Sequence, residues 1–209
     1  MALVKYNNNS ISAVTSAASM PSGAMTHIKT LTASSSATLS FVDGSDGVTL
    51  DSTYPIYLFK FINVHPATNG AKFTFQANAV GGSGYNETIT STQFQAYHKE
   101  DGSASGLNYN NGGDQAQGTG FQRLNGNIRN DSDASGSGEV YIFNPSSTTF
   151  VKHFLAYMGE PEDGSPTPLA SLHTAGYFNT TSALDEFQFK FNSGNIDAGK
   201  IKLYGIKDS

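Results

Sequence analysis

Apolar side chains alternate with polar ones along most of the chain after residue 24, and this two-residue period constrains the fold more than any other feature. Near the C-terminus, Phe187, Phe189 and Phe191 alternate with Gln188 and Lys190. Successive side chains of a β-strand point to opposite faces of its sheet, so such a run buries one face and exposes the other. The pattern therefore predicts half-buried β-strands.

Two runs, residues 57–64 and 150–157, are apolar at nearly every position. A strand that is apolar on both faces has both faces covered, because an exposed sheet face is normally polar. We expect these runs to be central strands, or strands that a second layer or a neighbouring subunit covers.

Turn-forming pairs separate the strand-like runs. They are Asp43-Gly44, Asp46-Gly47, Asn69-Gly70, Gly81-Gly82, Asn144-Pro145, Asp163-Gly164 and Ser193-Gly194. Roughly nine or ten short strands at this spacing, without a helical period, are typical of a sandwich of two sheets. The sequence predicts an all-β fold with one β-sandwich domain over residues 25–209 and a jelly-roll topology.

Two segments lack the alternation. Residues 1–24 are small and polar and end in a Pro21-Ser22-Gly23 break, which is typical of an extended arm, and we expect this arm to dock the domain on a partner. Residues 99–138 hold nine glycines among polar residues. So long a stretch without a period predicts a loop excursion at one end of the sandwich, with room for a short hairpin.

Charge and composition exclude several partners. The net charge is −5, with 12 lysines and arginines, so no basic face for nucleic acid is expected. The absence of cysteine removes disulfides, thiolate metal sites and thiol nucleophiles. No apolar run approaches the ~18 residues of a membrane span, and no signal-peptide pattern begins the chain. We therefore expect neither a membrane partner nor secretory export.

No catalytic motif is present. None of the five histidines pairs with another at metal-ligand spacing, and the chain lacks a G-x-S-x-G elbow, a phosphate-binding loop and a dinucleotide fingerprint. His98 is followed by Glu100 and Asp101, which we interpret as a strand end that opens into a polar loop. The chain is expected to have no enzymatic activity and no cofactor.

Two acidic loops could bind calcium, because hard cations take several oxygens from closely spaced carboxylates. The first contains Asp43, Asp46 and Asp51, and the second contains Asp131, Asp133 and Glu139. Neither has the spacing of an EF-hand loop. Ordinary turn chemistry of aspartate explains both, so they are kept only as calcium candidates.

Exposed aromatic side chains would support glycan binding, which is common on sandwich domains. Tryptophan, the strongest stacking platform, is absent, and most of the 14 phenylalanines and 10 tyrosines lie within strand-like runs. The tyrosines outside the clearest runs are candidates for surface recognition: Tyr85, Tyr109 and Tyr177.

The chain resembles, over nearly its whole length, a family of small virion structural proteins of marine tailed bacteriophages, which are described as tail-fibre-like or simply structural. The resemblance is carried by residues 3–11 (LVKYNNNSI), 32–38 (TASSSAT), 143–149 (FNPSSTT), 174–183 (TAGYFNTTSA) and 193–206 (SGNIDAGKIKLYGI). These are framework and turn residues. The resemblance implies a structural role without enzymatic activity, cofactor or catalytic residues.

From these observations we expect a structural protein of a virion, assembled in the host cytoplasm and decorating the capsid or the tail. Its arm would contact other virion proteins, and its doubly apolar strands favour a homotrimer. The alternative is a receptor- or glycan-binding module, such as an adhesin or tail fibre, that attaches the particle to a host-surface glycan.

Overall fold

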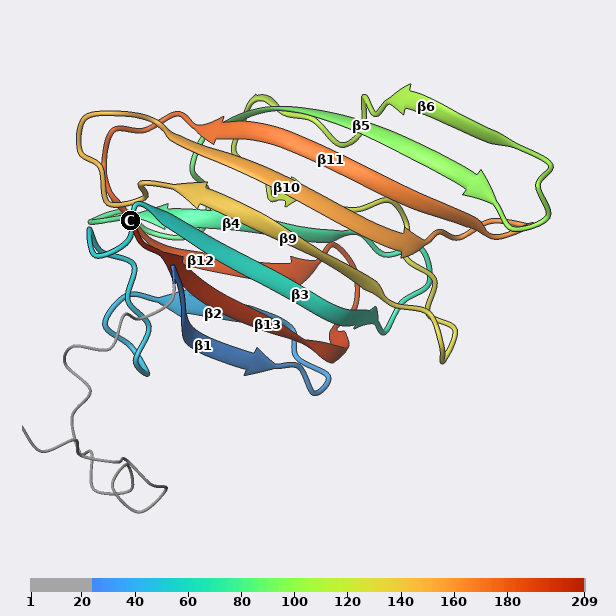
Figure 1. The fold of residues 1–209 in the computed structure, drawn as a ribbon, viewed down its shortest axis with the longest axis horizontal. Coiled ribbons are helices and arrows are strands. Elements are labelled where there is room, and N and C mark those ends of the chain that lie inside the picture. The colour runs from blue at the N-terminus through green and yellow to red at the C-terminus, as the bar shows by residue number, and fades with distance from the viewer. Residues whose placement is uncertain (1–23, 209) are drawn as a thin grey trace, which may run out of the picture.

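The computed structural model describes residues 24–208, which form thirteen β-strands in two antiparallel sheets that pack together (Figure 1). The expected arm, apart from Ala24, lies outside the described residues. The strands are β1 (Met25–Thr32), β2 (Leu39–Val42), β3 (Ile56–Pro66), β4 (Phe73–Ala79), β5 (Ile89–Lys99), β6 (Ser105–Tyr109), β7 (Ala116–Gly118), β8 (Gln122–Arg123), β9 (Gly136–Phe143), β10 (Lys152–Pro161), β11 (Pro168–Phe178), β12 (Leu184–Phe191) and β13 (Ile196–Ile206). No helix in this part of the chain is long and apolar enough to cross a membrane.

The strand order is that of a jelly roll. One sheet contains the run β1-β13-β3-β9, and the other has the order β2-β12-β4-β8. If these eight strands are numbered along the chain, the first, eighth, third and sixth form one sheet, and the second, seventh, fourth and fifth form the other. This is the arrangement of two interleaved Greek keys, and it confirms the predicted β-sandwich.

The larger sheet continues beyond the jelly roll. Next to β9 it adds β10, β11, β5 and β6, and β7 pairs with β5. These strands come from two insertions, β5 to β7 between β4 and β8, and β10 with β11 between β9 and β12. We call β10, β11, β5 and β6 the sheet extension; Figure 1 shows it at the side of the molecule opposite β1 and β13.

Phenylalanine rings fill the space between the two sheets of the jelly roll. Phe189 is fully buried, and the rings of five others lie 5.1–6.1 Å from its ring: Phe41, Phe59, Phe61, Phe73 and Phe75. Each such ring removed from water contributes roughly 1.5–3 kcal/mol. The two-residue period of β4 and β12 thus corresponds to one face packed on this core.

Both runs that are apolar on two faces form interior strands, as expected. β3 lies between β13 and β9, and β10 lies between β9 and β11. On β10, Phe154 and Met158 are buried in the core, whereas Leu155 and Tyr157 on the opposite face are exposed.

The glycine-rich segment 99–138 begins with a hairpin and then turns inward. β6 pairs with β5, and the following residues cover the inner side of the sheet extension. The contacts there are polar: Gln93 donates from Nε2 to Thr174 Oγ1 (2.7 Å), and buried Gln122 donates from Nε2 to the carbonyl of Gly113 (2.7 Å). The aromatic core therefore continues under β10 and β11 through Phe154 and Phe178, and amide contacts are added to it beneath β5.

Candidate functional site

The outward surface of the sheet extension carries no formal charge on its three longest strands. We call this surface, together with the adjoining strand β9, the outer face. Alternation along the strands turns fourteen side chains outward: Thr90, Thr92, Phe94, Ala96 and His98 on β5; His153, Leu155, Tyr157 and Gly159 on β10; Leu169, Ser171, His173, Ala175 and Tyr177 on β11. None is Asp, Glu, Lys or Arg, which is unusual for an exposed strand surface.

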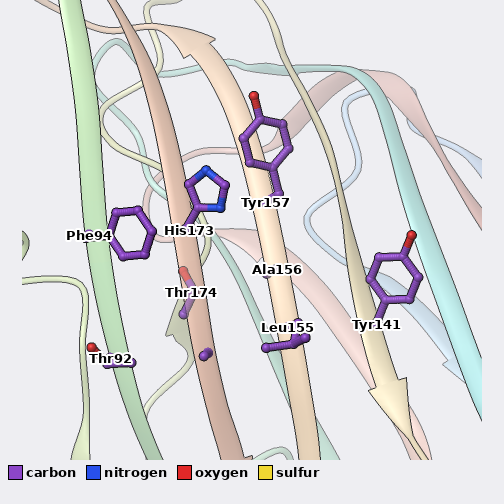
Figure 2. A pocket seen from close by; sticks show the side chains of 9 residues that line it. Thr92, Phe94, Tyr141, Leu155, Ala156, Tyr157, His173 and Thr174 are labelled. Atoms are coloured by element: carbon purple, nitrogen blue, oxygen red, sulfur yellow. The ribbon is translucent and has the colours of Figure 1, made fainter. Parts of the chain in front are cut away.

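A row of aromatic side chains crosses the outer face perpendicular to the strands. Antiparallel register places Tyr157 opposite His173, His173 opposite Phe94, and Phe94 opposite Tyr109. The ring centroids of Phe94 and His173 are 4.9 Å apart, and those of Tyr157 and His173 are 4.7 Å apart. We call these four residues the aromatic row, and Figure 2 shows three of them in line.

Smaller side chains beside the aromatic row leave a groove. Leu155, Ala175 and Thr92 form the next row across β10, β11 and β5, and Tyr141 on β9 lies beyond Leu155. The groove between this row and the aromatic row has a volume of about 320 Å³ (Figure 2). A second hollow of about 340 Å³ continues from the same three residues toward the His153–Tyr177 pair.

The residues on the other side of the aromatic row are small on β10, β11 and β5. Gly159 lies opposite Ser171, Ser171 lies opposite Ala96, and Ala96 lies opposite Leu107 at the edge strand. On β10, β11 and β5 the aromatic row is therefore flanked on this side by the small residues Gly159, Ser171 and Ala96. The opposite row contains Leu155, and the His153–Tyr177 pair lies beyond it.

Exposed apolar side chains concentrate on this surface. Of the ten large hydrophobic residues exposed in residues 24–208, six are on the outer face, at 43–70% exposure: Phe94, Leu107, Tyr109, Leu155, Tyr157 and Leu169. Scattered apolar residues need no explanation, but a contiguous group of this kind marks a surface that contacts another molecule.

The structure places the three tyrosines predicted for surface recognition in two different regions. Tyr109 and Tyr177 both lie on the outer face, and Tyr109 donates a hydrogen bond to Asp114 Oδ2 (2.7 Å). Tyr85 is half-buried and donates to Glu186 Oε2 (2.8 Å) on β12 of the smaller sheet; burial raises the pKa of its phenol.

Sequence reasoning missed the centre of the outer face, which consists of Leu155, Tyr157, His173 and Phe94. Leu155 and Tyr157 lie in the doubly apolar run 150–157, which we expected to be central or covered by a second layer or subunit, whereas Phe94 and His173 lie in no run that the sequence singled out. The available signal was the run at 150–157, whose two apolar faces required a partner on each side.

The carboxylates of the first calcium candidate stabilise turns. Asp43 Oδ1 accepts a hydrogen bond from the backbone N–H of Leu50, and Asp51 Oδ1 accepts one from that of Thr53, each at 2.8 Å. The hydrogen bonds from Thr53 lower the pKa of Asp51. The backbone carbonyl of Asp46 accepts from Lys29 Nζ.

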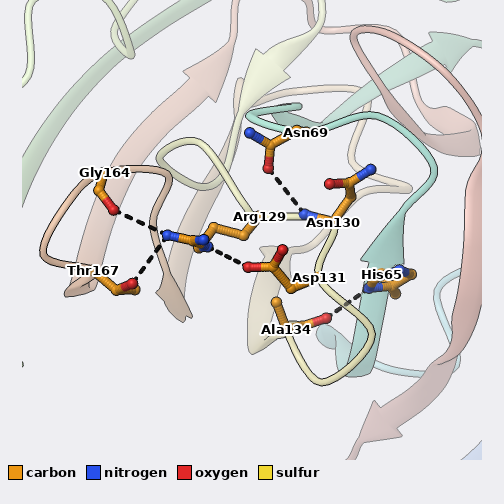
Figure 3. Close-up of polar contacts among 8 residues, drawn as sticks. All are labelled: His65, Asn69, Arg129, Asn130, Asp131, Ala134, Gly164 and Thr167. Carbon is orange, nitrogen blue, oxygen red and sulfur yellow. Dashed lines mark hydrogen bonds and ion pairs between the residues drawn. The ribbon is translucent and has the colours of Figure 1, made fainter.

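The second calcium candidate is divided between two places. Arg129 Nε lies 2.5 Å from Asp131 Oδ2, and its Nη1 donates to the carbonyl of Gly164 and to Thr167 Oγ1 (Figure 3). Glu139 lies on β9, where it forms an ion pair with Lys60 at 3.3 Å. Within residues 24–208, no three His, Asp or Glu side chains are grouped so that they could hold a metal ion. This holds for these five carboxylates and for Asp133, the sixth calcium candidate.

Two carboxylates lie beneath the sheet extension. Glu160 is 1% exposed, and its Oε1 accepts a hydrogen bond from the backbone N–H of Gly126, while Oε2 has no hydrogen-bond partner. Burial raises the pKa of Glu160 well above its usual value. Glu162 Oε2 accepts from Gln95 Nε2 (2.9 Å), and burial raises its pKa also. Neither carboxylate lines the grooves of the outer face.

The chain matches no protein-family model, no curated protein and no solved structure. The resemblance to virion proteins therefore stays an expectation from the sequence, and the outer face is the strongest structural guide to function.

Proposed function

We propose that the chain is a non-enzymatic structural protein of a tailed-phage virion, in which it forms an exposed β-sandwich module on the capsid or tail. The observation that carries the proposal is the aromatic outer face, which has no formal charge on β5, β10 and β11 and has six exposed large hydrophobic side chains. A soluble protein keeps such a surface when it contacts another macromolecule. The jelly-roll order agrees with this role, since viral capsid domains use the same fold, although a fold alone does not fix a function.

The polar groups of the described residues support a role without catalysis. General acid–base chemistry needs a titratable group, an orienting partner and an open site that meet in one place. Across residues 24–208, no histidine is hydrogen-bonded to a carboxylate: His27 contacts Thr30 and His65 contacts the carbonyl of Ala134. Three carboxylates have pKa values raised by burial, Glu160, Glu162 and Asp185, and none of them lines the grooves of the outer face.

The aromatic row favours the second candidate function, a receptor- or glycan-binding module. Sugars pack their C–H faces on aromatic rings, and Tyr109 and Tyr157 are about half exposed. A sugar site also needs several polar groups that fix each hydroxyl. Along the groove those groups are few, Thr92, His173 and the two tyrosines Tyr141 and Tyr157, so a protein partner fits this surface better.

The proposal is tested on purified phage particles that contain this protein. We expect the chain in the particle proteome at a copy number fixed by the symmetry of the capsid or tail, and cryo-electron microscopy of the particles to place a β-sandwich of this shape on the surface. If the chain is absent from particles that are otherwise complete, the virion role is wrong.

A further inference from the structure

We infer that the outer face pairs with the outer face of a second copy of this chain, related by a two-fold axis. The inference rests on the proposed function, because it names the first partner of an assembling subunit. Four observations support it: the charge, the relief and the area of the outer face, and the dispersal of the other exposed apolar residues.

Charge favours contact between two copies at this surface. Each chain carries a net charge of −5, so two copies repel each other over most orientations. The fourteen outward residues of β5, β10 and β11 carry no formal charge and add no like-charge repulsion when they meet. At the border, Glu139 is already neutralised by its ion pair with Lys60.

The relief of the outer face is complementary to itself. On one side the aromatic row is flanked by three small residues, Gly159, Ser171 and Ala96. On the other side Leu155 stands in the row with Ala175 and Thr92, so the low row is the one that contains Gly159. If the second copy is turned by 180° and shifted by one row, the aromatic row of each copy can lie against the row of small residues of the other, Gly159, Ser171 and Ala96. A two-fold contact requires this self-complementarity, since one patch must fit its own copy.

The area is that of a stable interface. Five neighbouring strands, β9 to β6, span about 24 Å at the usual strand spacing of ~4.8 Å, and the residues from Leu169 to Tyr177 extend about 30 Å. Because β6 and the paired part of β9 are shorter than the other three strands, the outer face offers roughly 600 Å² per copy. This is at the lower end of the ~600–1,000 Å² per partner of stable protein–protein interfaces.

The other exposed apolar residues argue for two-fold pairing over a ring. The remaining four large hydrophobics exposed in the described part of the chain are dispersed: Met25 on β1, Ile62 on β3, Val80 after β4 and Phe150 before β10. A homotrimer, which we expected from the sequence, would need the outer face to fit a different surface of its neighbour. No second apolar surface of comparable extent occurs within residues 24–208.

Sedimentation of the full-length protein tests the pairing. At about 50 µM we expect the mass of two 22.1 kDa chains, about 44 kDa. At this concentration even a micromolar dissociation constant makes the dimer the main species. A monomer at this concentration, or a trimer, would overturn the inference. If the monomer binds saccharides on an array instead, the outer face is a glycan site.

Two matched variants locate the contact. Leu155→Glu places a charge in the centre of the outer face and should weaken self-association by about tenfold or more, because a buried unpaired carboxylate is unfavourable. Val80→Glu makes the same change at a similarly exposed residue beyond the smaller sheet and should leave self-association unchanged. Equal effects of both variants, or no effect of Leu155→Glu, would contradict pairing through the outer face.

The absence of cysteine allows a direct second measurement. Single cysteines introduced at Ala96, Leu155, His173 or Ala175 should form disulfide-linked dimers under mild oxidation at one or more positions, and Val80→Cys should remain monomeric. If only Val80→Cys is cross-linked, the pairing is wrong. Neither experiment uses particles, so the virion role and the pairing of copies can fail separately.

Discussion

The rings of Phe94 on β5 and His173 on β11 lie parallel, with their planes 7° apart and their centroids 4.9 Å apart. The two residues are 79 positions apart in the sequence and become neighbours because β5 and β11 pair in register. Tyr157 of β10 contacts the same imidazole from the other side. His173 thus connects the strands of two separate insertions into one continuous aromatic surface.

The first prediction concerns the stacking of this pair. In a double-mutant cycle, Phe94→Ala and His173→Ala should show a coupling energy of about 0.5–1 kcal/mol, as cross-strand aromatic pairs do. Urea denaturation at concentrations where the protein is monomeric measures it. Phe94→Ala combined with Tyr177→Ala, four residues beyond His173 on β11, should be additive. A coupling of zero for the first pair would mean that the rings do not stack in solution.

The second prediction separates buried from exposed phenylalanines. Phe189→Ala removes the ring at the centre of the aromatic core and should lower the free energy of unfolding by about 3–5 kcal/mol. Phe150→Ala, at a residue 70% exposed, should change it by no more than about 0.5 kcal/mol. Chemical denaturation of both variants tests the prediction, and similar losses would place Phe150 in a contact that the fold does not contain.

The aromatic core around Phe189 could be predicted from the sequence, whereas the outer face could not. Phe187, Phe189 and Phe191 alternate with polar residues, so one face had to be buried, and the local pattern alone decides which. On β10 the residues of both faces are apolar, and the pattern does not tell Phe154, which is buried, from Leu155, which is exposed. The distinction arises only from what covers each face.

Long-range pairing explains the remaining differences. Tyr85, Tyr109 and Tyr177 were grouped as exposed aromatics, but only Tyr109 is exposed, and Tyr85 and Tyr177 are half-buried. The partner of Tyr85, Glu186, is 101 positions away, beyond the reach of any local pattern. The segment 99–138 has no period because its buried residues mix apolar Leu124 and Ile128 with polar Gln122 and Asn125. Asn125 Oδ1 accepts a hydrogen bond from the backbone N–H of Phe73, 52 positions away, which no local pattern indicates. The glycines of the segment therefore marked it as irregular without indicating that half of it packs inward.

The third prediction follows from the raised pKa of Glu160. The unfolded chain ionises this carboxyl from about its usual value of 4.5, whereas the folded protein holds the proton to higher pH. The stabilising contribution of the neutral acid is therefore complete below that value and is lost as the pH rises through the folded pKa. Glu160→Gln stays neutral, so it should equal the wild type near pH 4.5 and exceed its stability by about 1–3 kcal/mol at pH 8.

Denaturation of both proteins across this pH range measures the effect. Glu100→Gln, at an exposed turn position, is the matched control and should give a small difference that does not change with pH. If wild type and Glu160→Gln have parallel stability curves between pH 4.5 and 8, the carboxyl of Glu160 is ionised and solvated in the folded protein.

The fourth prediction concerns calcium. Asp43 and Asp51 accept backbone N–H groups, and Asp131 is paired with Arg129, so these oxygens are already used. A site with a dissociation constant of ~10 µM would stabilise the protein by about 2.7 kcal/mol at ~1 mM Ca²⁺. We expect calcium at ~1 mM to shift the melting temperature by less than about 1 °C relative to chelator or magnesium. A shift of several degrees with calcium alone would restore the candidates, and Asp131→Asn would then identify the loop.

The last prediction concerns residues 1–23, whose small, polar composition we interpret as part of a docking arm. Their deletion should leave the domain folded, because β1 begins at Met25 and the carbonyl of Ala24, which is retained, accepts a hydrogen bond from the backbone N–H of Lys207 at 2.9 Å. The free energy of unfolding should stay within about 0.5 kcal/mol of the full chain. The truncated protein should be absent from particles assembled in cells that produce it in place of the full chain, with the full chain supplied in the same way as the control. Quantitative mass spectrometry of purified particles measures both, and normal incorporation of the truncated protein would assign docking to the sandwich itself.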